Sequence, residues 1–169
     1  GFSPGAGDDS KKWPLEKFIK LAKIQIKNNR VPVFFLGPKE KNLLLKIKKE
    51  IPTALFPEWT DIAVNSGIKG PLLAISLAKQ IHIAVANDSG TGHMLAVGGT
   101  KLISLFSKHN PVKYAPNAEK LIIVDIFDVV KDSDLTSEIK SKLTLERLEQ
   151  DFSLKYRVLF FFSKSNCKI

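Results

Sequence analysis

Residues 81–106 read IHIAVANDSGTGHMLAVGGTKLISLF, and this stretch decides the fold of the 169-residue chain. It opens with an apolar run at 81–86, passes through the polar cluster NDSGTGH at 87–93, and closes with a second apolar run at 102–106. Strand, polar turn, short helix and strand, in this order, outline a βαβ unit. Ligands of open α/β sheets bind at the carboxyl ends of strands, so the polar cluster lies where a binding site is expected.

The rest of the chain repeats this alternation of helices and strands. We predict strands at 2–4, 31–36, 81–86, 102–106 and 121–124, and helices at 14–27, 40–50, 71–80 and 134–150. The segment 51–66 is ambiguous, with 53–56 and 61–64 as candidate short strands. The alternation predicts an α/β fold with a Rossmann-like parallel sheet and helices on both faces.

The composition and net charge of the chain indicate which kinds of ligand and site it can have. The formal charge is +9, from 26 basic and 17 acidic residues. Such an excess is typical either of a solvated lysine-rich surface or of attraction to an anionic ligand or lipid surface. The basic residues form no long run, which argues against a nucleic-acid partner. The single cysteine excludes an internal disulfide and a multi-cysteine metal site, and no apolar run is long enough to predict a spanning helix.

A glycine turn near the start is a candidate phosphate site. Gly5-Ala6-Gly7 follows the first predicted strand, and Lys11 precedes a helix. Backbone N–H groups and a lysine together can hold phosphate. The turn lacks the Gly-Lys-Ser/Thr ending of a P-loop and the third glycine of the dinucleotide fingerprint, so an ordinary strand-to-helix turn is an equal interpretation.

The polar cluster at 87–93 admits several interpretations. The tripeptide Asp88-Ser89-Gly90 also occurs in aspartic proteases, but those are all-β proteins. A serine-hydrolase elbow needs glycine two residues before the serine, where this chain has Asn87. Asp88 and Ser89 could cap the following helix, and free N–H groups at the helix start would favour an anion. His93 has no second histidine at helical spacing, which argues against a metal site.

Taken together, these motifs resemble a known family. SPGAG at 3–7, KKWP at 11–14, LGPKE at 36–40, NDSGTGH at 87–93 and the later LF, NP and AP pairs are similar to the family 9 glycosyltransferases. That family includes the ADP-heptose:lipopolysaccharide heptosyltransferases. The resemblance runs from about residue 2 to residue 130, and the Asn-Asp-Ser-Gly-x-x-His element after a strand is its most specific part.

The resemblance implies a GT-B architecture of two Rossmann-like domains, of which this chain resembles the C-terminal, donor-binding half. It implies eight substrate-binding residues, namely Ala6, Gly7, Lys11, Glu40, Asp88, Ser89, Gly90 and His93. The first three would lie by the diphosphate and Glu40 by the ribose. Asp88 would hold hydroxyls of the transferred sugar, Ser89 and Gly90 would face phosphate, and His93 would sit nearby.

The implied reaction is inverting transfer of heptose from ADP-heptose to a lipopolysaccharide core acceptor, with no cofactor and no metal. The catalytic base and acceptor site would belong to an N-terminal domain, so we expect this chain alone to be catalytically incomplete and to be a fragment or processed piece. We expect a cytoplasmic enzyme, peripheral at the anionic inner-membrane surface. Two alternatives stay open: a GT-B enzyme using another nucleotide sugar, or a non-enzymatic anion- or lipid-binding module.

The sequence also departs from the family pattern. Lys69-Gly70-Pro71-Leu72 stands where members often have threonine-serine-leucine, and Ser107 replaces the usual glycine after Phe106. We predict a nucleotide-sugar-binding domain at 1–130, followed by a C-terminal helix and tail at 131–169. The tail from 151 onward matches no motif of the family.

Overall fold

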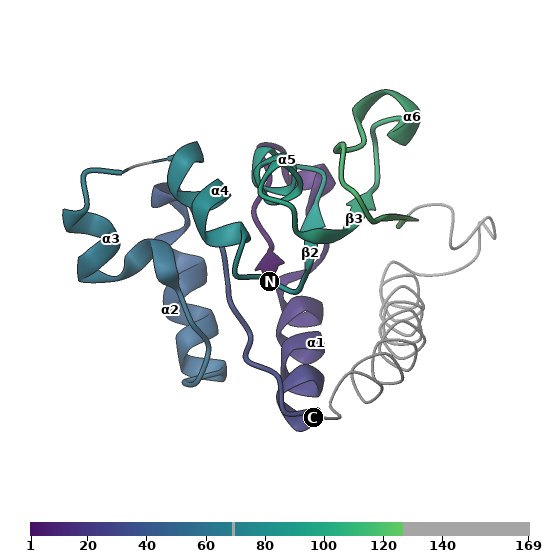
Figure 1. The fold of residues 1–169 in the computed structure, drawn as a ribbon. Helices are drawn as coiled ribbons and strands as arrows, with labels where there is room; N and C mark the ends of the chain where they lie inside the picture. The colour runs from purple at the N-terminus through teal and green to yellow at the C-terminus, as the bar shows by residue number, and fades with distance from the viewer. Residues whose placement is uncertain (69, 127–169) are drawn as a thin grey trace, which may run out of the picture.

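The structure, a computed structural model, describes residues 1–68 and 70–126 (Figure 1). Four parallel strands form a sheet in the order β1-β2-β3-β4. They are β1 (Phe2–Ser3), β2 (Ile83–Asn87), β3 (Lys101–Phe106) and β4 (Leu121–Asp125). Beyond β1, single parallel bridges join Phe2 to Phe34 and Val33 to Leu55. The predicted parallel sheet is therefore confirmed, although 31–36 and 53–56 contribute bridges rather than full strands.

Helices connect these strands. They are α1 (Leu15–Lys27), α2 (Lys41–Glu50), α3 (Asp61–Asn65), α4 (Pro71–Ala78), α5 (Gly90–Val97) and α6 (Pro111–Tyr114), with 3-10 turns η1 (Asp9–Lys11), η2 (Pro38–Glu40) and η3 (Pro57–Trp59). Of the two candidate strands in the ambiguous segment, the one at 61–64 is a helix, because the Thr60 hydroxyl accepts the Ala63 N–H at 3.2 Å and starts α3. The helix predicted at 134–150 lies outside the described residues.

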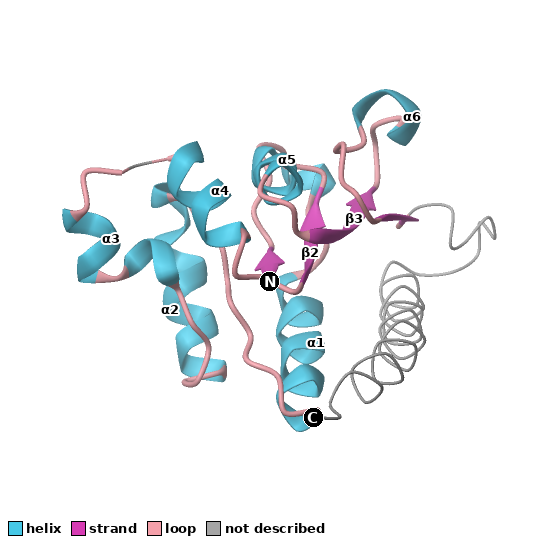
Figure 2. Cartoon of the chain, viewed as in Figure 1, coloured by secondary structure: helices cyan, strands magenta, loops and turns pink. Residues whose placement is uncertain are grey.

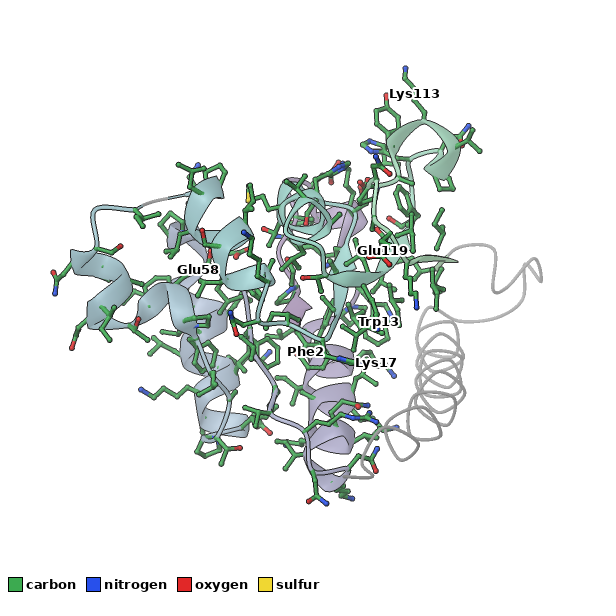
Figure 3. The ribbon with its side chains drawn as sticks, in the orientation of Figure 1. Phe2, Trp13, Lys17, Glu58, Lys113 and Glu119 are labelled. Carbon is green, nitrogen blue, oxygen red and sulfur yellow. The ribbon has the colours of Figure 1, made fainter. Side chains whose placement is uncertain are left out.

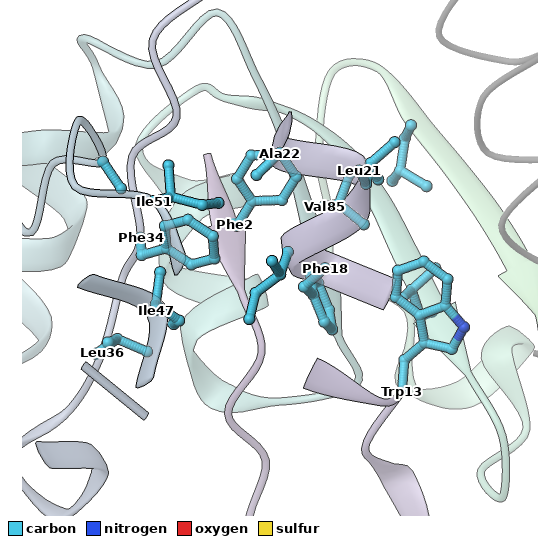
Figure 4. Close-up of a cluster of buried hydrophobic side chains, with 14 of the residues drawn as sticks. Phe2, Trp13, Phe18, Leu21, Ala22, Phe34, Leu36, Ile47, Ile51 and Val85 are labelled. Carbon is cyan, nitrogen blue, oxygen red and sulfur yellow. The ribbon is translucent and has the colours of Figure 1, made fainter. Parts of the chain in front are cut away.

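Two hydrophobic layers cover the two faces of the sheet. One layer packs α1 and α2 against strand side chains, and it includes Phe2, Phe18, Phe34, Ile47, Val85 and Ile103 (Figure 4). The other packs α4 and α5 against the intervening side chains, and it includes Phe35, Ala78, Ala84, Ala86, Leu95 and Leu102. Consecutive strand residues thus alternate between the layers, as a sheet buried on both faces requires.

The carboxyl ends of the parallel strands meet at one edge of the sheet. In Figure 2 the arrowheads of β2 and β3 point toward the end of the molecule that carries α5 and α6. The loops after β1, β2, β3 and the 33–36 segment therefore approach one another there, which is where an α/β sheet builds its site. Within residues 1–68 and 70–126, no helix has the length and apolar character needed to cross a membrane.

Candidate functional site

Asn87, the last residue of β2, fastens the glycine turn to the sheet. Its side chain is fully buried. The Oδ1 atom accepts the Trp13 N–H at 3.1 Å, and Nδ2 donates to the Pro4 carbonyl at 2.8 Å. Both ends of the 5–12 loop are therefore held by one amide, which presents the loop at the carboxyl edge of β2.

Asp88 follows directly and forms the charged centre of the site. It is only 7% exposed. Its Oδ2 atom lies 3.3 Å from Lys11 Nζ and 2.8 Å from His109 Nδ1. This buried oxygen faces the Lys11 ammonium and the His109 imidazole and makes no hydrogen bond among the described residues. The carboxylate offers two acceptor oxygens, and the buried Oδ2 becomes available to a ligand hydroxyl only when Lys11 or His109 moves aside.

Ser89 is the residue that caps α5. Its Oγ accepts the Gly92 N–H at 3.4 Å, and its backbone is extended, as an N-cap requires. The sequence left open whether Asp88 or Ser89 caps this helix; the structure gives the cap to Ser89 and leaves Asp88 to face Lys11 and His109. The N–H groups of Gly90 and Thr91, in the first helical turn, have no acceptor within the helix.

The loop after β3, at 107–109, contacts the loop at 5–12 that begins with the glycine turn, and we did not predict this contact from the sequence. Ser107 Oγ donates to the Ser10 carbonyl at 2.8 Å, and Lys108 Nζ lies 3.5 Å from Asp8 Oδ2. Hydrogen bonds from Ser10, backbone and side chain, lower the pKa of Asp8 to about 2, with a smaller contribution from Lys108. Together with His109 on Asp88, three consecutive residues reach across to the loops after β1 and β2. The parallel pairing of β2 and β3 brings the ends of these strands together and allows these contacts.

Glu40 reaches the same place from η2. Its Oε2 atom accepts the Gly37 N–H at 2.7 Å. A Cβ atom on Gly5 would lie 1.7 Å from Glu40 Oε1, so the glycine turn and this carboxylate are packed against each other. Glycine at position 5 is thus required by the close approach of Glu40.

A cavity of about 420 Å³ adjoins this group. It is lined by Leu36, Gly37 and Pro38, by Glu58 and Trp59, by parts of α3 and the start of α4, and by Thr91 and Met94 of α5. Its size is that of a small-molecule pocket, and its lining is largely apolar, as such pockets usually are. Because Thr91 lies in the first turn of α5, the cavity opens beside the loop that carries Asp88.

Glu58 is a half-buried carboxyl in the wall of this cavity. In Figure 3 it lies on the α3–α4 side of the molecule, on the opposite side from Lys113 of α6. Its Oε2 atom accepts the Leu36 N–H at 2.8 Å, and the Trp59 indole N–H donates to the Leu36 carbonyl at 2.9 Å. Burial raises the pKa of Glu58 to about 7; the Leu36 N–H opposes this rise and the negative charge of Glu40 adds to it.

This raised pKa predicts a pH-dependent effect of Glu58→Gln on stability. The folded-state pKa, about 7, exceeds the ordinary value of 4.5, so the parent chain loses stability as pH rises through this window. Glutamine does not ionise, so the free energy of unfolding of the variant, relative to that of the parent, should rise by about 1–2 kcal/mol as pH increases from below 4.5 to above 7. The rise is smaller than the pKa shift alone implies, because solvent screens a half-buried group. Urea unfolding at several pH values measures the difference.

The control for that series is Glu50→Gln. The Glu50 carboxylate is exposed and bonded to Lys23 at 2.7 Å, and this contact lowers its pKa. A carboxylate with a lowered pKa stabilises the fold above its ordinary pKa. The free energy of unfolding of this variant should therefore decrease relative to that of the parent as pH rises. The same pH slope for both variants would contradict our account of Glu58.

The structure brings together some of the eight predicted residues more closely than others. Lys11 contacts Asp88, while Ala6 and Gly7 lie in the loop that Asn87 holds. Glu40 packs on Gly5, one residue from Ala6. His93 lies on α5 with its side chain exposed, and within the described part of the chain it has no side-chain partner. Sequence reasoning missed Asn87, His109 and Glu58.

Comparison with known proteins gives a consistent result. The model of glycosyltransferase family 9 (heptosyltransferase) matches residues 1–142. Two Haemophilus influenzae proteins are similar in sequence: the lipopolysaccharide core heptosyltransferase OpsX, 26% identical over 126 residues, and lipooligosaccharide heptosyltransferase 2, 30% identical over 130 residues. The matches cover 75% and 76% of this chain but only 35% and 36% of those proteins.

Solved structures share the fold. ADP-heptose lipopolysaccharide heptosyltransferase II of E. coli superposes with a TM-score of 0.64 at 22% identity, over 89% of this chain and 45% of that one. A family 9 glycosyl transferase from Veillonella parvula gives 0.68 at 20% identity, over 89% and 43%. E. coli heptosyltransferase WaaC with ADP gives 0.66 at 15% identity, over 90% and 42%. This chain therefore corresponds to somewhat less than half of each solved chain.

Proposed function

This chain belongs to glycosyltransferase family 9, and we propose that it binds the nucleotide-sugar donor, ADP-heptose, in an enzyme that transfers heptose to a lipopolysaccharide core acceptor. The names of its relatives support this substrate pair. Because the chain spans about a third of the curated relatives, we propose that the acceptor site and catalytic base are supplied outside it. The observation that carries the proposal is the grouping of Lys11, Asp88 and His109 at the carboxyl edge of the sheet.

The diphosphate of the proposed ligand would lie between the glycine loop and α5. The Lys11 ammonium supplies a positive charge there, and the first turn of α5 supplies N–H groups at Gly90 and Thr91. Ala6 and Gly7 provide backbone without bulky side chains on the opposite side. An anion bound here would be neutralised by one side chain and by backbone dipoles.

The sugar and the nucleoside would extend from the diphosphate in two directions. The Asp88 carboxylate would accept hydroxyl groups of the heptose, with Lys11 or His109 moving aside from its buried Oδ2. Glu40 would accept hydroxyl groups of the ribose with Oε1, since its Oε2 is bonded to Gly37. The base would enter the 420 Å³ cavity, whose apolar lining suits a planar ring.

In the proposed reaction, an acceptor hydroxyl attacks the anomeric carbon of the heptose while the bond to the ADP oxygen breaks. The hydroxyl proton passes to a base outside this chain. Negative charge develops on the departing diphosphate, and Lys11 with the start of α5 would stabilise that charge. This domain would therefore assist the leaving group rather than activate the nucleophile.

Nucleotide titration tests the proposal against its alternatives. Isothermal calorimetry of this chain should detect ADP and show weaker binding of UDP. A different nucleotide-sugar enzyme would prefer UDP or another diphosphate. A module that binds anions by charge alone would bind both nucleotides equally and lose them together as salt is raised. Absence of heat and of a thermal shift at millimolar ADP would defeat the proposal.

Lys11→Ala should weaken ADP binding by about 1.5 kcal/mol, roughly tenfold, the value of one hydrogen bond to a charged group. The matched control is Lys12→Ala. Lys12 has the same charge and is the next residue, but its Nζ bonds the exposed Asp9 at 2.6 Å instead of Asp88. Calorimetry should show the loss only for Lys11. Equal losses for both variants would mean that ADP responds to general charge and not to this site.

A further inference from the structure

The two oxygens of Glu58 have different surroundings. Oε2 is occupied by the Leu36 N–H, while the structure gives Oε1 no hydrogen bond among the described residues, and the carboxyl lines the cavity. Leu36, Pro38, Val64 and Leu73 make most of the nearby wall apolar. A single carboxylate in an apolar pocket is the kind of polar group that fixes the orientation and identity of a ligand.

We propose that Glu58 selects the base of the nucleotide, accepting a hydrogen bond from the exocyclic amino group of a 6-aminopurine and rejecting a 6-oxopurine. This inference rests on the proposed function, which places the base in this cavity. An ionised carboxylate only accepts hydrogen bonds. The inference places the carboxylate opposite position 6 and not opposite N1, whose N–H in a 6-oxopurine would donate to it. A 6-oxo group only accepts, so at position 6 it would leave two acceptors facing each other in a poorly solvated place.

The hydrogen bond from the Leu36 N–H allows a single substitution, Glu58→Gln, to reverse the preference for a 6-aminopurine over a 6-oxopurine. In Glu58→Gln, the side-chain carbonyl must face the Leu36 N–H, because an amide NH₂ cannot accept that bond. The NH₂ group then occupies the place of Oε1 and faces the cavity. A donor therefore replaces an acceptor without a change in side-chain size, so the variant should favour the 6-oxopurine.

The test compares ADP with IDP on the parent chain and on Glu58→Gln. The two nucleotides differ in the 6-substituent of the purine, amino or oxo, and in N1, which accepts in ADP and donates in IDP. Titrations are run at about pH 8.5, where a carboxyl of pKa about 7 is ionised. The parent should bind ADP about tenfold more tightly than IDP, and the variant should bind IDP at least as tightly as ADP. Glu50→Gln, which removes an exposed carboxylate that does not line the cavity, should keep the parent ratio.

The possible outcomes distinguish base selection by Glu58 from the proposed binding of ADP by this chain. If the parent binds ADP but the ADP-to-IDP ratio is the same in Glu58→Gln, Glu58 does not select the base and the inference fails alone. If the parent binds neither nucleotide, the proposed function fails and the inference fails with it. Melting temperatures of all three proteins show whether the variant remains folded, and a Glu58→Asp variant with weakened ADP preference supplies a second measure of the same contact.

Discussion

Asn87→Ala is expected to lower the free energy of unfolding by about 2–5 kcal/mol. The change leaves the Trp13 N–H and the Pro4 carbonyl without partners in a buried place, and each unsatisfied group costs about 1–3 kcal/mol. The two ends of the glycine loop also lose their common attachment to β2. We therefore expect ADP affinity to fall together with stability.

Urea unfolding followed by tryptophan fluorescence measures this effect, since Trp13 is buried beside Phe18 with ring centroids 5.0 Å apart. Asn110→Ala is the control. Asn110 also uses its side-chain oxygen to accept a backbone N–H, that of Val112, but it is exposed at the start of α6. Loss of such a cap costs about 1 kcal/mol. If the two variants are equally destabilised, Asn87 does not fasten the loop as we describe.

The sequence predicted the central βαβ unit well because its signals are local. Apolar runs at 81–86 and 102–106 are typical of strands buried on both faces, and both became strands within a residue or two. The segment 61–64 failed for an equally local reason. Its short apolar run after Asp61 suggested a strand, yet the Thr60 cap and Asp61 in the first turn favour a helix.

Contacts between distant loops could not be read from the sequence in the same way. His109 lies in a loop with no motif around it, so it was not singled out, but the parallel register of β2 and β3 places it against Asp88. Glu58 follows a proline in an ambiguous segment, and the bridge between Val33 and Leu55, with the hydrogen bonds of Glu58 and Trp59 to Leu36, brings that segment to the site. Predicting these contacts requires the strand order, which residue types do not specify.

Asp88→Asn is expected to weaken ADP-heptose by about 2–3 kcal/mol, roughly 30- to 150-fold, while ADP binding changes little. The carboxylate would accept sugar hydroxyls once Lys11 or His109 moves aside, and hydrogen bonds to a charged acceptor are roughly twice as strong as neutral ones. Asparagine keeps the size of the side chain but loses the charge. Lys11, released from its contact with Asp88, remains available to the diphosphate.

The melting temperature of Asp88→Asn distinguishes a sugar-binding role of Asp88 from a structural one. Lys11 and His109 are 18% and 34% exposed, so both can be hydrated when the charge at Asp88 is lost, and the melting temperature should move little. Ser89→Ala is the opposite control, because it removes the α5 cap at a cost of about 1 kcal/mol without touching a group assigned to the sugar. Calorimetry with ADP and ADP-heptose, together with thermal melts, distinguishes the outcomes. Equal losses for both ligands would move Asp88 away from the sugar, and a large drop in melting temperature with unchanged affinities would make it a structural residue.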